Sequence, residues 1–207
     1  MRKIFVILAL VALAGVPVAA NAFQGPADGA MAWNVDANHT EVSFSVKHFF
    51  TPVRGSFRDF EVKFQFDKDD PTNSTVEAKI AIASVSTGNE QRDAHLRTAD
   101  WFEVDKYPYM TFKSTSVSKV GENQYVARGP LTIKGITREI EMPISVLGVH
   151  MIPEQMRGRM GITEAASFHA ELEINRSDFN VGTGSWAGTM VVGANVKIEI
   201  IVEANHT

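Results

Sequence analysis

The side chains best suited to chemistry gather in residues 87–108, which read TGNEQRDAHLRTADWFEVDKYP. Residues 90–98 contain only residue types that a helix tolerates, and Thr87 or Asn89 can cap its first turn. On such a helix, Arg92 has two roles open to it. Its planar donor fork can bind an anionic or carbonyl head group of a ligand, or it can donate to backbone carbonyls and hold the helix in place.

Large apolar side chains in the same segment indicate a covering role. Leu96, Trp101 and Phe102 lie within or just beyond the expected helix, and Pro108 ends the segment. A short helical connection that carries such groups buries them against another apolar surface. The segment therefore predicts a lid, with these three side chains facing whatever the lid covers.

The six histidines give little support for a metal centre. None stands in an H-x-H or H-E-x-x-H spacing, so we expect no zinc site. His48 ends a stretch in which Phe44 and Val46 share its face, so its ring is expected to point inward. There it can hydrogen-bond a ligand head group, or it is a core histidine with an internal partner.

Signals for catalysis and for cofactor binding are also weak. A catalytic nucleophile needs an adjacent base that a third group orients, and the chain has no G-x-S-x-G elbow. Residues 182–188, GTGSWAG, lack the lysine of a phosphate-binding loop. We therefore expect a binding protein with no catalytic residues and no cofactor of its own.

Alternation of apolar and polar residues with a period of two dominates the rest of the chain. Residues 60–66, FEVKFQF, are typical, because all their apolar side chains fall on one face. This pattern predicts β-strands with one buried side. Eight strands are expected, at residues 42–48, 60–66, 76–82, 112–116, 124–131, 140–146, 168–174 and 196–202.

Eight strands with a single buried face favour an all-β fold, an eight-stranded antiparallel barrel with a short helical lid between strands three and four. A two-sheet sandwich satisfies the same periodicity and is the alternative. The inward side chains mix bulky and small groups, so the barrel either encloses an elongated apolar cavity or is filled. The bulky ones are Phe44, Phe60, Phe64, Phe66, Phe112 and Phe168.

The first 22 residues have the pattern of a cleaved export signal. A short basic start precedes an apolar run, and residues 20–22, ANA, fit cleavage after Ala22. Residues 23–32 would then form a flexible N-terminal segment. The sequence thus predicts an exported protein of the periplasm.

Composition excludes further classes. Without residues 1–22, 24 acidic residues face 18 basic ones, a formal charge of −6. An acidic chain without a basic cluster is a poor partner for nucleic acid. The chain contains no cysteine, so its stability comes from packing rather than disulfides.

Five stretches in chain order resemble the YceI family: WNVDANHTEVSFSVKH, VRGSFRDF, STGNEQRDAHLRTADWFEVDKYPYMTFKS, GPLTIKGITREIEMPI and FHAELEINRSDFNVG. The resemblance runs from about Trp33 to Glu203, within the expected barrel domain at residues 33–204. It implies an exported lipocalin-like barrel that binds a polyisoprenoid lipid. The chain departs from the family pattern at Asn180, where similar sequences often have glycine. Residues 150–161, HMIPEQMRGRMG, match no pattern that assigns them a role.

The resemblance implies a periplasmic carrier that encloses an isoprenoid-type lipid, either a quinone or a polyprenyl chain. It also leaves room for a homodimer and for transient contact with a membrane or a membrane protein. Two alternative functions stand beside the carrier: an enzyme that modifies a lipid or quinone, and a filled barrel that serves as a stress-related interaction module. The residues expected to contact the lipid are Phe44, His48, Phe64, Ile80, Arg92, Leu96, Trp101, Phe102, Phe112 and Phe168.

Overall fold

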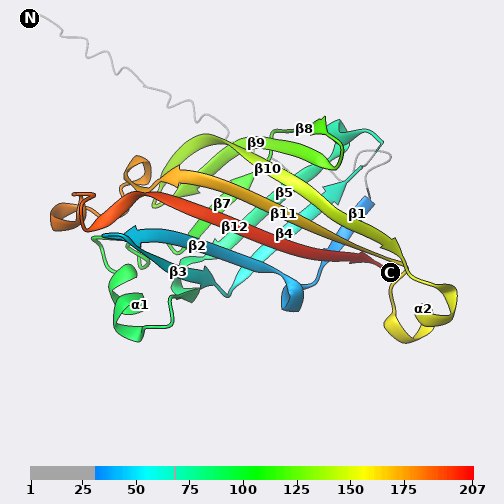
Figure 1. Cartoon of the computed structure of the whole chain (residues 1–207), viewed down its shortest axis with the longest axis horizontal. Coiled ribbons are helices and arrows are strands. Elements are labelled where there is room, and N and C mark those ends of the chain that lie inside the picture. The colour runs from blue at the N-terminus through cyan, green and yellow to red at the C-terminus, as the bar shows by residue number, and fades with distance from the viewer. Residues whose placement is uncertain (1–30, 68) are drawn as a thin grey trace, which may run out of the picture.

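Twelve strands form one sheet in the computed structural model, which describes residues 31–67 and 69–207 (Figure 1). The strands are β1 (Met31–Val35), β2 (Glu41–His48), β3 (Thr51–Phe57), β4 (Phe60–Phe66), β5 (Thr75–Ala81), β6 (Val85–Ser86), β7 (Tyr109–Lys113), β8 (Ser116–Gly121), β9 (Gln124–Ile133), β10 (Ile136–Met151), β11 (Glu164–Asn175) and β12 (Val192–His206). The same residues include two α-helices and five short 3-10 helices: α1 (Glu90–Leu96), α2 (Glu154–Met160), η1 (Ala37–His39), η2 (Pro71–Asn73), η3 (Ile82–Ser84), η4 (Arg176–Phe179) and η5 (Gly184–Trp186).

In four places, two consecutive short strands form the two halves of one interrupted long strand. β1 and β2 both pair with β12. β4 pairs with β1, and β3 pairs with β2. β5 pairs with β4 in turn, and β6 pairs with β3. β7 and β8 both pair with β9. The described sheet is therefore a closed antiparallel barrel of eight long strands, and the predicted fold class is confirmed.

Each of the eight predicted strand ranges falls in a different long strand. What the pattern missed are the other halves, β1, β3, β6 and β8. β3 contains Pro52 and Gly55, two residues that disfavour strands. Gly55 lets the Phe44 ring lie against the backbone of β3, because a Cβ at this position would lie 2.5 Å from the end of that ring.

The predicted signal peptide, residues 1–22, lies outside the described residues. Of the predicted flexible segment, 23–32, residues 31 and 32 belong to β1, and residues 23–30 lie outside the described residues. Within residues 31–67 and 69–207, none of the helices is long and apolar enough to cross a membrane.

The lid predicted between the third and fourth long strands is α1 and the turns that follow it. In Figure 1 it lies below one end of the barrel, beside β3. Asn89 caps the helix by accepting a hydrogen bond from the Arg92 amide at 2.9 Å. The buried Asp93 carboxylate accepts from both the amide and the hydroxyl of Thr87, which fixes the entry of the chain into the helix.

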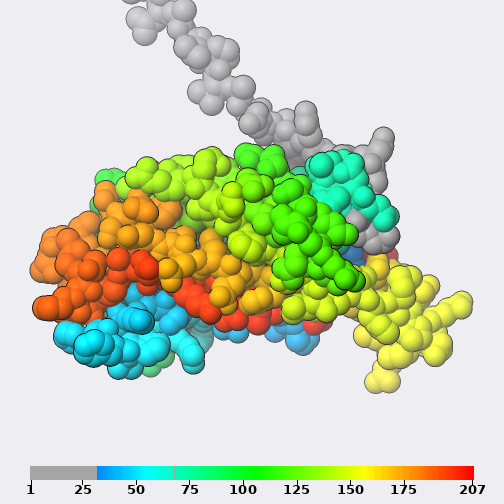
Figure 2. Space-filling model, turned by 45° about the horizontal axis from the view of Figure 1, so that its top comes forward, coloured from blue at the N-terminus to red at the C-terminus, as the bar shows by residue number. Residues whose placement is uncertain are grey.

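Residues 150–161, which the sequence left without a role, form a projecting arm made of the end of β10 and α2. The arm stands away from the body of the barrel in Figure 2 (yellow). Its methionines, Met151, Met156 and Met160, are all exposed.

Candidate functional site

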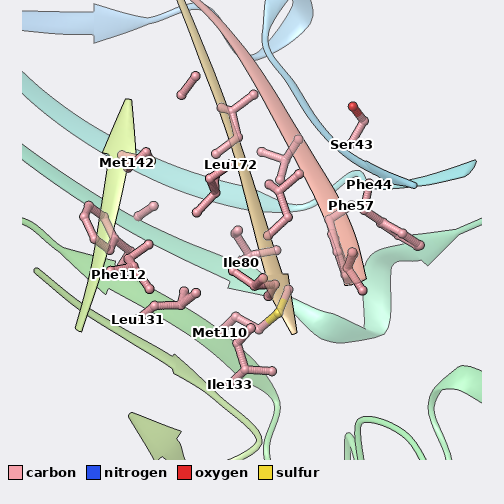
Figure 3. A pocket seen from close by; sticks show the side chains of 18 of the residues that line it. Ser43, Phe44, Phe57, Ile80, Met110, Phe112, Leu131, Ile133, Met142 and Leu172 are labelled. Carbon is pink, nitrogen blue, oxygen red and sulfur yellow. The ribbon is translucent and has the colours of Figure 1, made fainter. Parts of the chain in front are cut away.

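An apolar cavity of about 200 Å³ lies inside the barrel (Figure 3). All eight long strands contribute lining side chains, and Figure 3 shows Ile80, Phe112, Met142 and Leu172 reaching this space from different strands. The lining residues of β12 run from Val192 to Val202, about 33 Å of strand at roughly 3.3 Å per residue. The cavity is therefore elongated, and the alternative of a completely filled barrel is wrong.

One end of the cavity lies under the lid. Leu96, Trp101 and Phe102 all line the cavity, as predicted. Phe102 packs edge-on against Phe57 of β3, with ring centroids 6.1 Å apart. Trp101 contacts Trp186 of η5 at 5.7 Å between ring centroids, so the lid is joined to the loop that precedes β12.

Arg176, in η4, is the single charged side chain among the described residues that line the cavity. It is only 3% exposed, and loss of hydration lowers the pKa of its guanidinium. Its nitrogens donate to backbone carbonyls at 2.8–3.3 Å, and its guanidinium carbon lies 5.6 Å from the Trp101 ring centroid. The carbonyls belong to Val181, Gly182, Trp186, Gly188, Val192 and Gly193. Arg176 thus organises the loop between η4 and β12 rather than offering free donors to a ligand.

Two further cations fasten the lid through backbone carbonyls. Lys134 is 8% exposed, and its ammonium donates to the carbonyls of Ala99 at 2.7 Å and Asn180 at 3.0 Å. Desolvation lowers the pKa of Lys134, an effect that the carboxylates of Glu103 and Asp100 partly oppose. Arg97 donates to two carbonyls of the segment before the helix, at 3.0 and 3.1 Å. The Lys134 bonds join the lid to segments far away in sequence, and the Arg97 bonds fasten it to the segment that precedes the helix.

The other end of the cavity is closed by aromatic rings. Phe64 of β4 and Phe168 of β11 meet with ring centroids 4.6 Å apart and planes at 71°. Phe66 packs behind both, at 5.9 Å from Phe64 and 5.6 Å from Phe168. Trp33 contacts Phe168 edge-on at 6.2 Å. The cavity therefore has a lid end and an aromatic end.

Eight of the ten residues expected to contact a lipid line the cavity: Phe44, Phe64, Ile80, Leu96, Trp101, Phe102, Phe112 and Phe168. Their contact with a ligand stays a prediction. Further residues line the cavity without having been predicted as ligand contacts: Met110, Leu131, Ile133, Arg176, Val181 and Val192. Leu131 lies within a predicted strand, whereas Met110, Ile133 and Val192 lie in strands but beyond the predicted ranges, and Arg176 and Val181 lie outside any strand.

His48 and Arg92 are not among the residues that line the cavity, and the inward ring expected of His48 is not found. His48 is exposed, and its ring packs edge-on against Phe49 at 4.9 Å rather than pointing inward. His48 is the last residue of β2, at the end of the strand, where the side chain is open to solvent. Arg92 donates to the hydroxyl and the carbonyl of Thr87, at 2.7 and 3.0 Å, so it has the anchoring role.

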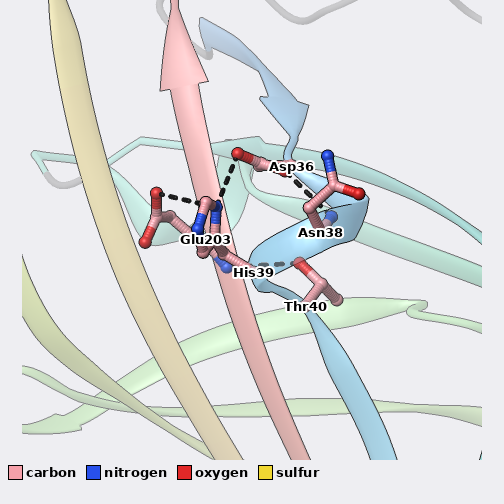
Figure 4. A network of polar contacts seen from close by, with 5 residues as sticks. All are labelled: Asp36, Asn38, His39, Thr40 and Glu203. Carbon is pink, nitrogen blue, oxygen red and sulfur yellow. Dashed lines mark hydrogen bonds and ion pairs between the residues drawn. The ribbon is translucent and has the colours of Figure 1, made fainter.

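Two surface groups in the described residues bring a histidine near carboxylates, although no metal spacing is visible in the sequence. In the first, His39 Nδ1 lies 2.9 Å from Asp36 and 3.8 Å from Glu203 (Figure 4). The hydrogen bond to Asp36 raises the pKa of His39, and the same bond lowers the pKa of Asp36. The second group is His169, Glu171 and Glu199. The first group fastens the corner between β1 and β2 to β12, which is a structural role.

Comparisons with known proteins agree with this architecture. Residues 33–204 match the family described as the YceI-like domain. Protein YceI of Escherichia coli is 32% identical over 190 residues, which cover 90% of this chain and 95% of that protein. The crystal structure of Burkholderia cenocepacia BcnA is similar with a TM-score of 0.74 at 30% identity, covering 83% of this chain and 99% of BcnA.

A further solved structure shares the fold at lower sequence similarity. It is a polyisoprenoid-binding domain from Saccharophagus degradans, with a TM-score of 0.61 and 15% identity, covering 84% of this chain and 98% of that domain. The match over residues 33–204, together with a closed eight-stranded barrel around an apolar cavity, shows that this chain belongs to the YceI-like domain family.

Proposed function

We propose that this protein encloses the hydrocarbon tail of an isoprenoid-type lipid, a quinone or a polyprenyl chain, and acts as a carrier in the periplasm. The observation that carries the proposal is the elongated apolar cavity inside a closed barrel. The fold shared with the polyisoprenoid-binding domain of S. degradans supports the same class of ligand. A chain-like ligand fits a cavity whose lining extends over about 33 Å of β12.

Tail burial supplies the affinity in this proposal. At about 0.8 kcal/mol per buried CH₂, the five carbons of one isoprene unit contribute up to about 4 kcal/mol. Ordering the flexible tail offsets part of that gain. The lining offers few polar partners for a head group, because the guanidinium of Arg176 already donates to backbone carbonyls. Selectivity is therefore expected to depend on the tail more than on the head group.

We propose binding rather than turnover. General acid–base catalysis needs a positioned side chain that exchanges a proton near neutral pH. Among the described residues that line the cavity, Arg176 is the single ionisable one, and arginine does not exchange its proton in that range. The geometry therefore supports a carrier better than an enzyme.

Contact with a membrane is proposed at an apolar rim made of Phe49, Phe50 and Met190. Their side chains are 52%, 94% and 83% exposed. The Phe49 amide donates to the Val191 carbonyl at 2.7 Å, so the two loops lie side by side next to the lining residue Val192. Exposed aromatic and methionine side chains beside a lipid cavity suit insertion into a bilayer interface.

The test of the binding proposal is displacement of a fluorescent apolar probe by all-trans prenols. Ala78 lines the cavity, so Ala78→Phe should fill it and weaken prenol binding at least tenfold. Ala37 is exposed in η1, and Ala37→Phe is the matched control that should bind as wild type does. Equal binding by all three proteins would overturn the proposed site. Periplasmic location and homodimerisation stay predictions.

A further inference from the structure

A second, much smaller cavity of about 10 Å³ lies behind the aromatic end of the main one. Phe64, Val76, Ile144 and Phe168 line both cavities. The small cavity is completed on its far side by residues that the main cavity does not touch: Phe66, Ser74, Val117, Tyr125 and Val146. The two spaces are therefore neighbours that share one wall.

The wall is a pair of rings that meet across the interior of the barrel. Phe64 comes from β4 and Phe168 from β11, and neither strand pairs with the other in the closed sheet. The rings are 8% and 4% exposed as whole residues and lie edge to face at 4.6 Å. Contacts with Phe66 and Trp33 hold Phe168 from two further sides. Close-packed interiors leave such a ring little room to move.

We propose that the Phe64–Phe168 pair is a length stop that sets how long a lipid tail the cavity accepts. The inference rests on the proposed tail-binding function and adds which residues determine selectivity. A tail that enters at the lid end ends against these rings. An additional isoprene unit must stay outside the barrel, where it gains nothing from burial.

The proposal predicts the effect of opening the wall. Removing the Phe168 ring joins the main cavity to the small one and lets the tail end reach Phe66 and Tyr125. Phe168→Ala should then favour a prenol longer by at least one isoprene unit, with a gain of at least tenfold relative to wild type. Phe168→Trp, which thickens the wall, should shift the preferred length in the opposite direction.

The experiment measures dissociation constants for a series of all-trans prenols that differ by one isoprene unit. Phe57→Leu is the matched control, because Phe57 also lines the cavity but lies at the lid end against Phe102. It should change affinities for all lengths together and leave the preferred length unchanged. Phe168→Leu keeps most of the core volume and repeats the test if Phe168→Ala does not fold.

The outcomes separate the length stop from the binding function. A shifted preferred length in the Phe168 variants, with none in Phe57→Leu, supports the stop. An unchanged preferred length in folded Phe168 variants, or an equal shift in the control, overturns it while leaving tail binding intact. Failure of every prenol to bind the wild-type protein refutes the proposed function itself.

Discussion

Replacing Arg176 by methionine should destabilise the protein more than any exposed charge change. Methionine keeps the apolar length of the side chain but removes every donor from the loop between η4 and β12. Six carbonyls receive hydrogen bonds from Arg176, and each such bond contributes about 1 kcal/mol net. Water that enters the loosened loop recovers part of this, so the expected loss is about 4 kcal/mol, in the range for breaking a buried charged network.

Urea unfolding measures this loss. With a slope of about 2 kcal/mol per molar urea, a loss of about 4 kcal/mol lowers the unfolding midpoint by about 2 M. Arg176→Lys should lie between wild type and Arg176→Met, since an ammonium has three donors and a guanidinium has five. An unchanged slope would show that the loss comes from the folded state rather than from a more compact unfolded chain.

The matched control is Arg128→Met. Arg128 also donates hydrogen bonds, to Glu141 at 2.8 Å and to Ser118 at 3.2 Å, but its side chain is 46% exposed. Exposed ion pairs contribute about 1 kcal/mol or less, so this variant should unfold close to wild type. If Arg176→Met were as mild as Arg128→Met, the carbonyl network would not hold the loop, and the reasoning would be refuted.

Three further predictions concern the β1–β2 corner, the apolar rim and the lid. The hydrogen bond to Asp36 raises the pKa of His39, so folding favours the imidazolium form. The stabilisation that His39 contributes is therefore complete below the ordinary pKa of 6.5 and is lost as pH rises through the raised pKa. His39→Gln should therefore reduce the free energy of unfolding when denaturant titrations are run below pH 6.5. An equal reduction above the raised pKa would contradict a contribution from the imidazolium. Phe50→Ser combined with Met190→Ser should reduce flotation with phosphatidylethanolamine–phosphatidylglycerol vesicles while leaving prenol binding intact, and unchanged flotation would exclude the rim. Lys134→Met should accelerate hydrogen exchange in residues 97–104, whereas unchanged exchange there would show that the ammonium does not fasten the lid.

The strands could be predicted because each has one apolar and one polar face. Residues 60–66 and 196–202, for example, alternate without interruption and lie within β4 and β12. The strand β3 could not be predicted, because Pro52 and Gly55 disfavour strands and interrupt the alternation. The need for glycine at position 55 depends on the ring of Phe44, which belongs to a neighbouring strand.

The apolar residues of the candidate site could be predicted from the sequence, whereas its polar residues mostly could not. Phe44, Phe112 and Phe168 follow directly from strand periodicity. Arg176 has backbone carbonyls as partners, and no residue type in the sequence marks those. His48 was misplaced because it is the last residue of β2, and alternation along a strand does not show where the strand leaves the barrel interior.

The most direct test of the central claim is native mass spectrometry of the protein purified from its own cells, followed by organic extraction of the sample. We expect additional mass from one bound isoprenoid-type lipid, released on extraction and absent from Ala78→Phe, whose added ring occupies the cavity. A bare protein mass that stays unchanged after incubation with prenols of every length would contradict the account.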